Sequence, residues 1–326
     1  MCRFKRVSLS RVLILIIVVS LPNLARGQAF QGYTLYAPSA SPARTYLVNM
    51  SNTIVKTWTH TVGGAYSCYL LADGTLLRSA AFGSGLNGGG ATGMVQKVSW
   101  SGTVSWQYTY STSSYRSHHD IEPMPNGNVL LIAWEVKIAA QGVAAGLNHS
   151  ASIWPDHIIE VQPVGSTGGN IVWQWHAWDH LIQDFDPTKA NYGVVAGHPE
   201  LMDINYGSSA AGDWMHVNGI SYNATKDQIV FSSHNLNEVY VIDHSTTTAE
   251  AAGHTGGRWG KGGDFLYRWG NPAAYRAPGT RVFDVVHCGS WVPDSLPGGG
   301  HIMAFNNRAS QSTSIIVEFT PPVDRS

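Results

Sequence analysis

The chain has 326 residues, of which 13% are charged, and its formal net charge at pH 7 is −1. A weak charge without a run of Lys or Arg argues against nucleic acid or an anionic membrane as the main partner. The 35 glycines, 12 tryptophans and 14 tyrosines favour strands and turns over helices.

Residues 1–27 have the pattern of a secretory signal peptide. Basic residues precede an apolar run at 12–21, and Ala25-Arg26-Gly27 offers small residues around a cleavage point. We expect a mature chain that begins near Gln28 and is secreted or periplasmic. No later segment is apolar over a length that would cross a bilayer, so no membrane span is predicted in the mature chain.

Two cysteines, Cys68 and Cys288, follow the predicted signal peptide. A disulfide framework is therefore not what holds this exported chain together. One bridge between the two cysteines or two buried thiols are both compatible with the sequence.

Strand-like segments recur along the remainder of the chain. Four of them begin at a turn residue and alternate to an aromatic end, at 52–58, 102–108, 169–175 and 263–269. Each is preceded by another period-two run, at 46–49, 95–98, 158–161 and 238–242, and a fifth such run lies at 314–319. This alternation predicts paired antiparallel strands.

Inner hairpins lie between these pairs, at 66–71 with 75–78, 119–122 with 128–133, 216–222 with 228–233, and 285–291 with 301–306. In the second hairpin, Asn126-Gly127 predicts a type I′ turn, in which both central residues have positive φ. Four strands per repeated unit indicate an all-β fold, a β-propeller of four-stranded antiparallel blades, rather than a β-sandwich.

The predicted units do not close a ring. If the first pair is the outer half of a blade that the C-terminus completes, three full units and most of a fourth remain. Either residues 33–36 close a small ring or the chain lacks its last blades. We therefore expect one propeller domain at 28–326 that is incomplete at its C-terminus.

Histidine stands out among the ionisable residues, with 14 in the chain. His119, His216 and His287 occur near the starts of three inner strands, and innermost strands line the channel of a propeller. We expect these three imidazoles to converge, although a structural role is open for each. His118 is expected to be a turn or surface residue on the opposite face from His119.

Other familiar sites are not indicated. His176 and His180 have metal-ligand spacing, but no Glu follows the first and a helix is doubtful there. The sequence has no phosphate-binding loop, no Rossmann glycine pattern and no nucleophile elbow. We expect no metal and no cofactor.

Five stretches together resemble the bacterial-type, donor-dependent arylsulfotransferase family. They are Gly-Tyr-Thr-Leu-Tyr at 32–36, His-His-Asp-Ile-Glu-Pro-Met-Pro-Asn-Gly-Asn at 118–128, Asp-Trp-Met-His-Val-Asn at 213–218, Asn-Glu-Val-Tyr-Val-Ile-Asp at 237–243, and Gly-Asp-Phe-Leu-Tyr-Arg-Trp-Gly-Asn-Pro at 263–272. The resemblance implies a six-bladed propeller that moves a sulfuryl group from a phenolic sulfate ester to a phenol without a nucleotide donor. The implied partners are a small aryl sulfate and a phenolic acceptor.

The resemblance also implies roles for individual residues. His287 corresponds to the family's nucleophile and would carry a sulfo-histidine. His216 and Asn218 match its His-x-Asn pair, and His119 the remaining channel histidine. His119 or His216 would protonate the departing phenolate, and Asn218 would bind the sulfuryl oxygens.

One departure from the family is at residue 234, where a histidine replaces an arginine after the His-x-Asn strand. A fixed cation thus becomes a titratable imidazole, and sulfuryl transfer is expected to be weak, acid-shifted or lost if His234 borders the substrate. Two alternatives stay open: a propeller that binds a ligand or a protein in its channel, and an aryl sulfatase in which water replaces the phenol.

Overall fold

The computed structural model describes residues 31–38, 41–64, 66–208, 212–310 and 312–322. The predicted signal peptide at 1–27 lies outside these residues. Contacts divide the chain into Met1–Gly32 and Tyr33–Ser326, and the second unit contains the folded sheets. No helix in the described residues is long and apolar enough to cross a membrane.

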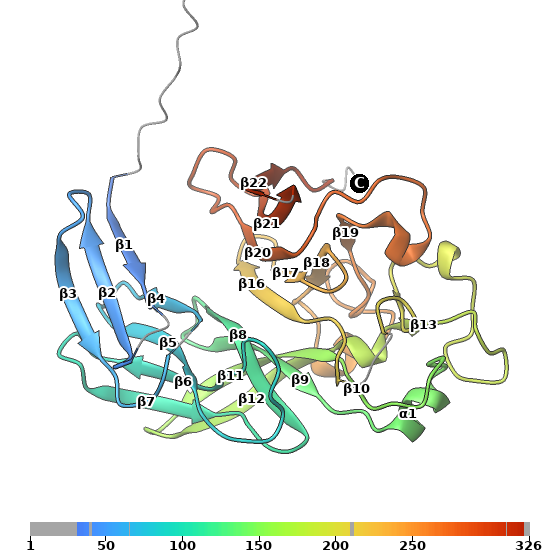
Figure 1. The fold of residues 1–326 in the computed structure, drawn as a ribbon, viewed down its shortest axis with the longest axis horizontal. Coiled ribbons are helices and arrows are strands. Elements are labelled where there is room, and N and C mark those ends of the chain that lie inside the picture. Colours follow the sequence, from blue (N-terminus) through green and yellow to red (C-terminus); the bar gives the residue numbers. More distant parts are fainter. Residues whose placement is uncertain (1–30, 39–40, 65, 209–211, 311, 323–326) are drawn as a thin grey trace, which may run out of the picture. The chain divides into compact units, whose positions relative to one another are not determined.

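Five antiparallel sheets follow one another in chain order as the blades of a β-propeller (Figure 1). Blades 1 and 2 contain β1 (Tyr33–Tyr36), β2 (Arg44–Asn49) and β3 (Ile54–Thr59), then β4 (Cys68–Leu70), β5 (Leu76–Ala81), β6 (Gly93–Val98) and β7 (Val104–Thr109). Blade 3 contains β8 (Tyr115–Pro123), β9 (Val129–Glu135), β11 (Asp156–Val164) and β12 (Gly168–His176).

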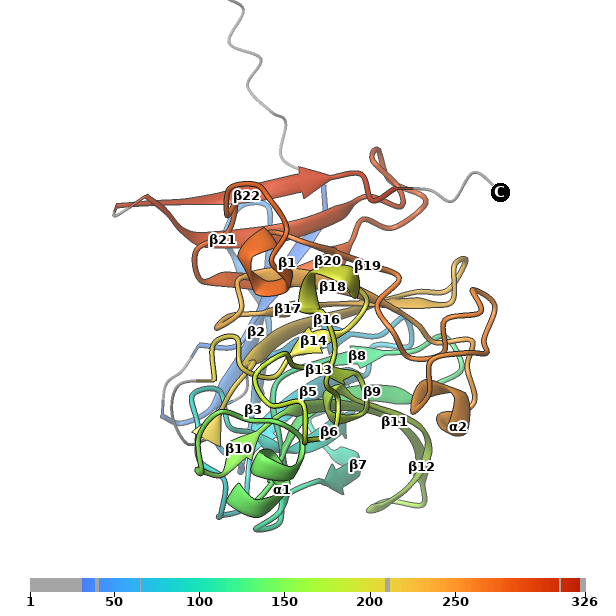
Figure 2. The same cartoon turned by 90° about the vertical axis from the view of Figure 1, so that its right-hand side faces the viewer.

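Blade 4 contains β16 (Val217–Asn223), β17 (Gln228–Ser233), β18 (Glu238–Asp243) and β19 (Tyr267–Trp269). Blade 5 contains β20 (Val286–Trp291), β21 (Ile302–Ser310) and β22 (Thr313–Phe319), which are stacked in the turned view (Figure 2). The prediction of antiparallel blades is confirmed, but the number of blades is five rather than six.

The expectation that the first pair of strands forms one blade with the C-terminal strands was wrong. β2 and β3 do not join the C-terminal strands, because β1 pairs with β2 from Tyr33 opposite Asn49 to Tyr36 opposite Tyr46. The strands β20, β21 and β22 form a sheet of their own.

Short elements in the connections complete the structure. Two parallel pairs join β10 (Ile153–Trp154) to β15 (Gly212–Asp213) and β13 (Leu181–Ile182) to β14 (Met202–Asp203). The helices are α1 (Ala139–Ala144) and α2 (Thr248–Ala251), with 3-10 helices η1 (Ala177–Asp179), η2 (Val195–Gly197) and η3 (Pro272–Tyr275).

The alternation of each strand supplies the core, because successive residues face opposite neighbouring blades. On β9, Leu131 packs in a cluster with blade 2 residues such as Trp106, whereas Leu130 packs in a cluster with blade 4 residues such as Phe231. On β17, Phe231 and Val230 divide in the same way between the clusters toward blades 3 and 5. Both faces of a central blade are therefore buried.

Tryptophans of three outer strands connect their blades to the following blade. Trp58, Trp106 and Trp175 donate their indole N–H groups to the carbonyls of Ser99, Gly168 and Gly263, at 3.1, 2.8 and 2.7 Å. Each tryptophan thus buries a large apolar surface and satisfies its polar atom in the following blade. Trp58 and Trp175 end two of the segments predicted from the sequence, whereas Trp106 lies two residues before the end of its segment.

The turn at Asn126-Gly127 differs from the type I′ prediction. Gly127 has φ of 86°, but Asn126 is not among the residues with positive φ. Met124 closes the loop by accepting the N–H of Gly127 at 3.0 Å and donating to Asn128 O at 3.0 Å. Pro125 fixes its own φ near −65°, which suits the first position of a type I turn and moves the left-handed conformation to Gly127.

Candidate active site

The three histidines expected in the channel lie at irregular points of the inner strands. His119 is in β8, His216 directly precedes β16, and His287 is the second residue of β20. The pairing register shifts at all three places, between Ser117 and Ile121, between Val217 and Gly219, and between His287 and Ser290. His119 and His216 have φ of 48° and 53°, a left-handed conformation that non-glycine residues seldom adopt.

These histidines form a continuous row with His234, which follows β17. The ring centroids are 4.6 Å apart for His119 and His216, 4.9 Å for His216 and His234, and 5.5 Å for His234 and His287. We call His119, His216, His234 and His287 the histidine row. All four side chains are partly exposed. Blades 3, 4 and 5 thus bring together residues that are far apart in the sequence.

His216 is the member of the row whose pKa is raised. Its Nδ1 is 2.5 Å from Asp213 Oδ2, while Asp213 Oδ1 accepts the indole N–H of Trp134 at 2.9 Å. Burial alone would lower the pKa of His216, but the hydrogen bond to Asp213 and the negative charge of this carboxylate outweigh it and raise the pKa. His216 is therefore suited to donate a proton near neutral pH.

His287 has the opposite electrostatic character. Burial lowers its pKa, and the neighbouring His216 lowers it further, against a hydrogen bond to Val285 O. This bond joins Nδ1 to the carbonyl oxygen at 3.1 Å, so Nδ1 carries the hydrogen and Nε2 the lone pair. The flanking residues Val285 and Cys288 have φ of 58° and 51°. The strained backbone presents a neutral imidazole with a free nitrogen lone pair.

His234 lies between these two groups. Its Nδ1 is 2.7 Å from Asn235 Oδ1. Burial lowers the pKa of His234, and the nearby His216 and His287 lower it further. The imidazole of His234 is therefore mostly neutral at pH 7.

His118, which was expected at the surface, is buried and belongs to the site. It stacks on Trp134 with the ring centroids 4.0 Å apart, and its Nε2 is 2.6 Å from Asp156 Oδ1. Its Nδ1 is 2.9 Å from Nδ1 of His119. The left-handed residue at 119 breaks the strand alternation, so that both imidazoles turn toward each other.

Asp156, His118 and His119 form a chain of hydrogen bonds that ends in the histidine row. Burial raises the pKa of Asp156 and lowers the pKa of His118 to about 3, so the pair is neutral overall. Burial and the four neighbouring imidazoles lower the pKa of His119 to about 2. With Asp156 protonated, its hydrogen bonds to Nε2 of His118, and His118 donates from Nδ1 to Nδ1 of His119, so the hydrogen of the neutral His119 ring lies on Nε2, which can donate. Sequence patterns gave no signal for Asp156.

Asn218 connects two strands of the site. Its side-chain amide donates to Val286 O at 2.7 Å and accepts the hydroxyl of Ser232 at 2.7 Å. Ser232 in turn accepts the backbone N–H of Gly289 at 3.0 Å. These bonds hold β20, and with it His287, against β16 and β17. Contact of Asn218 with a substrate stays a prediction.

A glycine-rich loop covers part of the row. A β-carbon at Gly90 would lie 2.1 Å from the ring of His119, and one at Gly89 would lie 3.3 Å from the ring of His216. Gly88 likewise faces Trp134 at 2.8 Å. The backbone at Gly90 therefore packs on the ring of His119 at a distance that only glycine permits, and Gly88 does the same on Trp134.

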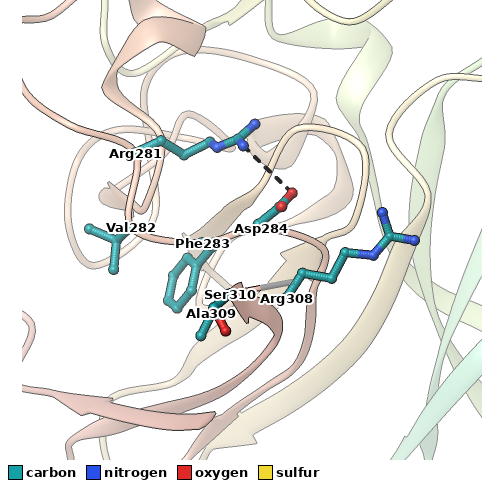
Figure 3. A pocket seen from close by; sticks show the side chains of 7 residues that line it. All are labelled: Arg281, Val282, Phe283, Asp284, Arg308, Ala309 and Ser310. Atoms are coloured by element: carbon teal, nitrogen blue, oxygen red, sulfur yellow. Dashed lines mark ion pairs between the residues drawn. The ribbon is translucent and has the colours of Figure 1, made fainter. Parts of the chain in front are cut away.

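A cavity of about 810 Å³ opens at the start of blade 5 (Figure 3). It is lined by residues 281–284 and 308–310, and Arg281 pairs there with Asp284 at 3.6 Å. None of the four histidines lines it. We assign the site to the histidine row rather than to this open cavity, because the chemistry requires converging titratable groups.

Two pairs that the sequence left open do not come together. Cys68 and Cys288 are both free thiols. His176 Nδ1 is 3.1 Å from Glu135 Oε1, whereas His180 Nδ1 is 2.8 Å from Asp264 Oδ1, so the two histidines of the i, i+4 pair bind different partners. The 3-10 helix η1 separates them in place of an α-helical turn.

A model of the family "Arylsulfotransferase (ASST)" matches residues 72–315, which is more than half of the chain. The chain belongs to the arylsulfotransferase family. The matched segment contains every member of the histidine row, together with His118, Asp156 and Asn218. A comparison with curated proteins finds no match.

Solved structures similar to this arylsulfotransferase family member are distant. A hydrazine synthase of Kuenenia stuttgartiensis has 12% identity and a TM-score of 0.47, with 88% of this chain and 68% of that chain covered. A protein of unknown function from Bacteroides caccae has 10% identity and a TM-score of 0.43, covering 88% and 73%. A virginiamycin B lyase of Staphylococcus aureus has 12% identity and a TM-score of 0.36, covering 91% and 73%.

Proposed function

We propose that this chain is an exported aryl-sulfate sulfotransferase that moves a sulfuryl group from a phenolic sulfate ester to a phenol through a sulfo-histidine at residue 287. The observation that carries the proposal is the opposite electrostatic character of two residues in one row. The pKa of His216 is raised and the pKa of His287 is lowered. Such a separation assigns an acid and a nucleophile that coexist near neutral pH.

In the first half-reaction, Nε2 of His287 attacks the sulfur of the aryl sulfate. The N–S bond forms as the bond between sulfur and the aryl oxygen breaks, and the protonated His216 gives its proton to the departing phenolate. Asp213 stabilises the charge on His216 before this transfer. His119, whose Nε2 can carry a hydrogen, is placed to donate to a sulfuryl oxygen.

The second half-reaction reverses the roles. The neutral His216 takes the proton of the acceptor phenol, whose oxygen attacks the sulfur of the sulfo-histidine. The S–N bond breaks, and both histidines return to their starting states. A nucleotide is not required, because the donor and the acceptor are both aryl compounds.

Hydrolysis is the second candidate reaction. The observation that favours it is the partial exposure of the row, since water that enters could replace the phenol. The same sulfo-enzyme would then release sulfate. A propeller that binds a ligand without turnover is the remaining alternative, and the neutral His234 in place of arginine is the feature that supports it.

The experiment that tests the proposal measures phenol release from an aryl sulfate with and without a second phenol as acceptor. We expect release to rise with acceptor concentration and to give parallel double-reciprocal plots, as ping-pong kinetics require. His287→Ala should lose this activity. His301 directly precedes β21 and pairs with Glu318, away from the histidine row, so His301→Ala should keep the activity. Phenol release whose rate does not depend on the acceptor concentration would favour the sulfatase. Absence of phenol release would favour the binding protein.

The export part of the proposal rests on residues 1–27. We expect the protein secreted by its host to begin near Gln28, which N-terminal sequencing of the purified protein would check. A full-length protein that retains residues 1–27 would contradict it.

A further inference from the structure

A second group of histidines lies away from the histidine row, in the connections of blades 3 and 4. His180 follows η1, His254 follows α2, and Asp264 precedes β19. Their ligand atoms all lie within 4.8 Å of one another. The Nδ1 atoms of both histidines approach the same oxygen, Asp264 Oδ1, at 2.8 Å each.

The hydrogen bonds of His180 leave a lone pair directed at the carboxylate. Its Nε2 is 2.9 Å from Ala251 O, and because a carbonyl oxygen can only accept, Nε2 carries the hydrogen. A neutral imidazole then has its lone pair on Nδ1, which faces an oxygen that also carries lone pairs. A cation between the two atoms, either a proton or a metal ion, resolves this conflict.

The surroundings of His180 are typical of a metal ligand. Metal-binding imidazoles commonly donate the second ring N–H to a backbone carbonyl, as His180 does to Ala251. The side chain of His180 is 0% exposed and stacks parallel to Trp175. A β-carbon at Gly263 would lie 2.0 Å from Ala251 O and 2.5 Å from Nε2 of His180, so glycine is required there.

The donor set indicates which ion would bind. Two imidazoles and one carboxylate suit Zn²⁺ and similar divalent metals better than Ca²⁺ or Mg²⁺. Ligand atoms around tetrahedral zinc are about 3.3 Å apart, so the pairs at 2.8 Å need to open by roughly 0.5 Å. The side chain of His254 is 59% exposed, which leaves a fourth position open to water.

We propose that His180, His254 and Asp264 bind a divalent transition metal, of which Zn²⁺ is the favoured ion, as a structural centre. The connection at 252–266 lacks strands and helices and carries Gly256, Gly257, Gly260 and Gly262 at positive φ. A metal ion that closes a long, irregular connection is expected to contribute more to stability than one that closes a short one, because closing a longer loop restricts more conformations of the chain. The centre joins this connection to the residue that follows η1.

The test uses the purified chain, stripped with a chelator and titrated with ZnCl₂ by calorimetry. We expect one tight site, and a melting temperature that rises with Zn²⁺ concentration. His254→Ala, at an exposed side chain that leaves the fold intact, should weaken Zn²⁺ binding at least tenfold. His301→Ala is the matched control, because its imidazole is also surface-exposed and paired with a carboxylate, Glu318, at 2.7 Å.

Two results would overturn the proposal. Absence of Zn²⁺ binding by the stripped wild-type chain would show that His180, His254 and Asp264 form hydrogen bonds only. Binding that survives in His254→Ala but is lost in His234→Ala would place the metal in the histidine row. Neither result bears on sulfuryl transfer, which is measured separately.

Discussion

At the scale of single residues, the proposed sulfuryl transfer depends on environments that separate the pKa values of two imidazoles in the histidine row. Asp213 raises the pKa of His216, whereas burial lowers the pKa of His287 and of His234. The nucleophile must be neutral and the acid protonated. The working range therefore lies above the pKa of His287 and below the pKa of His216.

This order predicts a bell-shaped pH profile for kcat/KM. Activity should rise with pH at a value below about 6.5, as His287 loses its proton, and fall at a value above about 6.5, as His216 loses its own. Asp213→Asn removes the charge that raises the pKa of His216, so the alkaline limb should move to lower pH. For this variant we expect kcat/KM to fall about 100-fold with sulfate esters of phenols that are poor leaving groups, and much less with nitrophenyl sulfate.

The control for this variant is Asp227→Asn. Asp227 Oδ1 is 2.8 Å from Nδ1 of His244, so the variant removes the same kind of pair away from the histidine row. A profile that is unchanged by Asp213→Asn, or changed equally by Asp227→Asn, would contradict the role assigned to His216.

Residue 234 gives a second prediction. Because the pKa of His234 is lowered, the imidazole is mostly neutral from about pH 6.5 upward. His234→Arg would add a permanent charge beside the sulfuryl group, and we expect transfer to increase about tenfold across pH 6.5 to 8. The neutral variant His234→Gln should show no such gain. Equal rates of sulfuryl transfer for His234→Arg and His234→Gln would show that a charge at residue 234 does not assist the reaction.

At the scale of elements, the site depends on irregular strands and on a loop without side chains. His119 adopts φ of 48° opposite Gly90, whose own φ is 81°. We expect Gly90→Ala to displace His119 and to lower kcat at least tenfold. Gly102→Ala is the control, since Gly102 has φ of 97° but nothing within 4 Å of its added β-carbon.

Both variants strain a left-handed backbone, so both should lose about 1 kcal/mol of folding stability. Thermal unfolding and activity, measured on the same samples, separate the two effects. If Gly102→Ala lost as much kcat as Gly90→Ala, the contact with His119 would not explain the loss.

These elements also show what the sequence could predict. Period-two alternation and the recurring aromatic residues located the strands, and the histidines at the starts of inner strands indicated the row. Alternation failed at His118, because the register shift beyond Ser117 and the left-handed residue at 119 turn two successive side chains toward one site. Asp156 had no signal, since a lone carboxylate at the start of a strand is common.

At the scale of the whole molecule, side chains join blades where strands do not pair. Asp120 and Glu122 of β8 accept the backbone N–H groups of Ile220 and Tyr222 of β16, both at 3.2 Å. Burial raises the pKa of Asp120 to about 6 and the pKa of Glu122 to about 8. Neighbouring blades could be inferred from chain order, but these contacts depend on the packing of one blade against the next, which no local pattern encodes.

The raised pKa values predict how stability depends on pH. In the unfolded chain Glu122 titrates near 4.5, so the folded state binds an additional proton between about pH 4.5 and 8. Stability should therefore fall as the pH rises through this range, by about 1.4 kcal/mol for each unit of the shift. Glu122→Gln keeps the acceptor for Tyr222, and its melting temperature should fall less between pH 5 and 8. An identical decline in wild type and variant would contradict the assignment.

The proposed mechanism requires a nucleophilic histidine from blade 5 and an acid from blade 4 in one histidine row. The measurement that tests it most directly is the intact mass of the enzyme after mixing with an aryl sulfate in the absence of acceptor, followed by peptide mapping. We predict the added mass of one sulfuryl group, located on His287, absent from His287→Ala and discharged by added phenol. An adduct on another residue, or turnover without any adduct, would contradict the account.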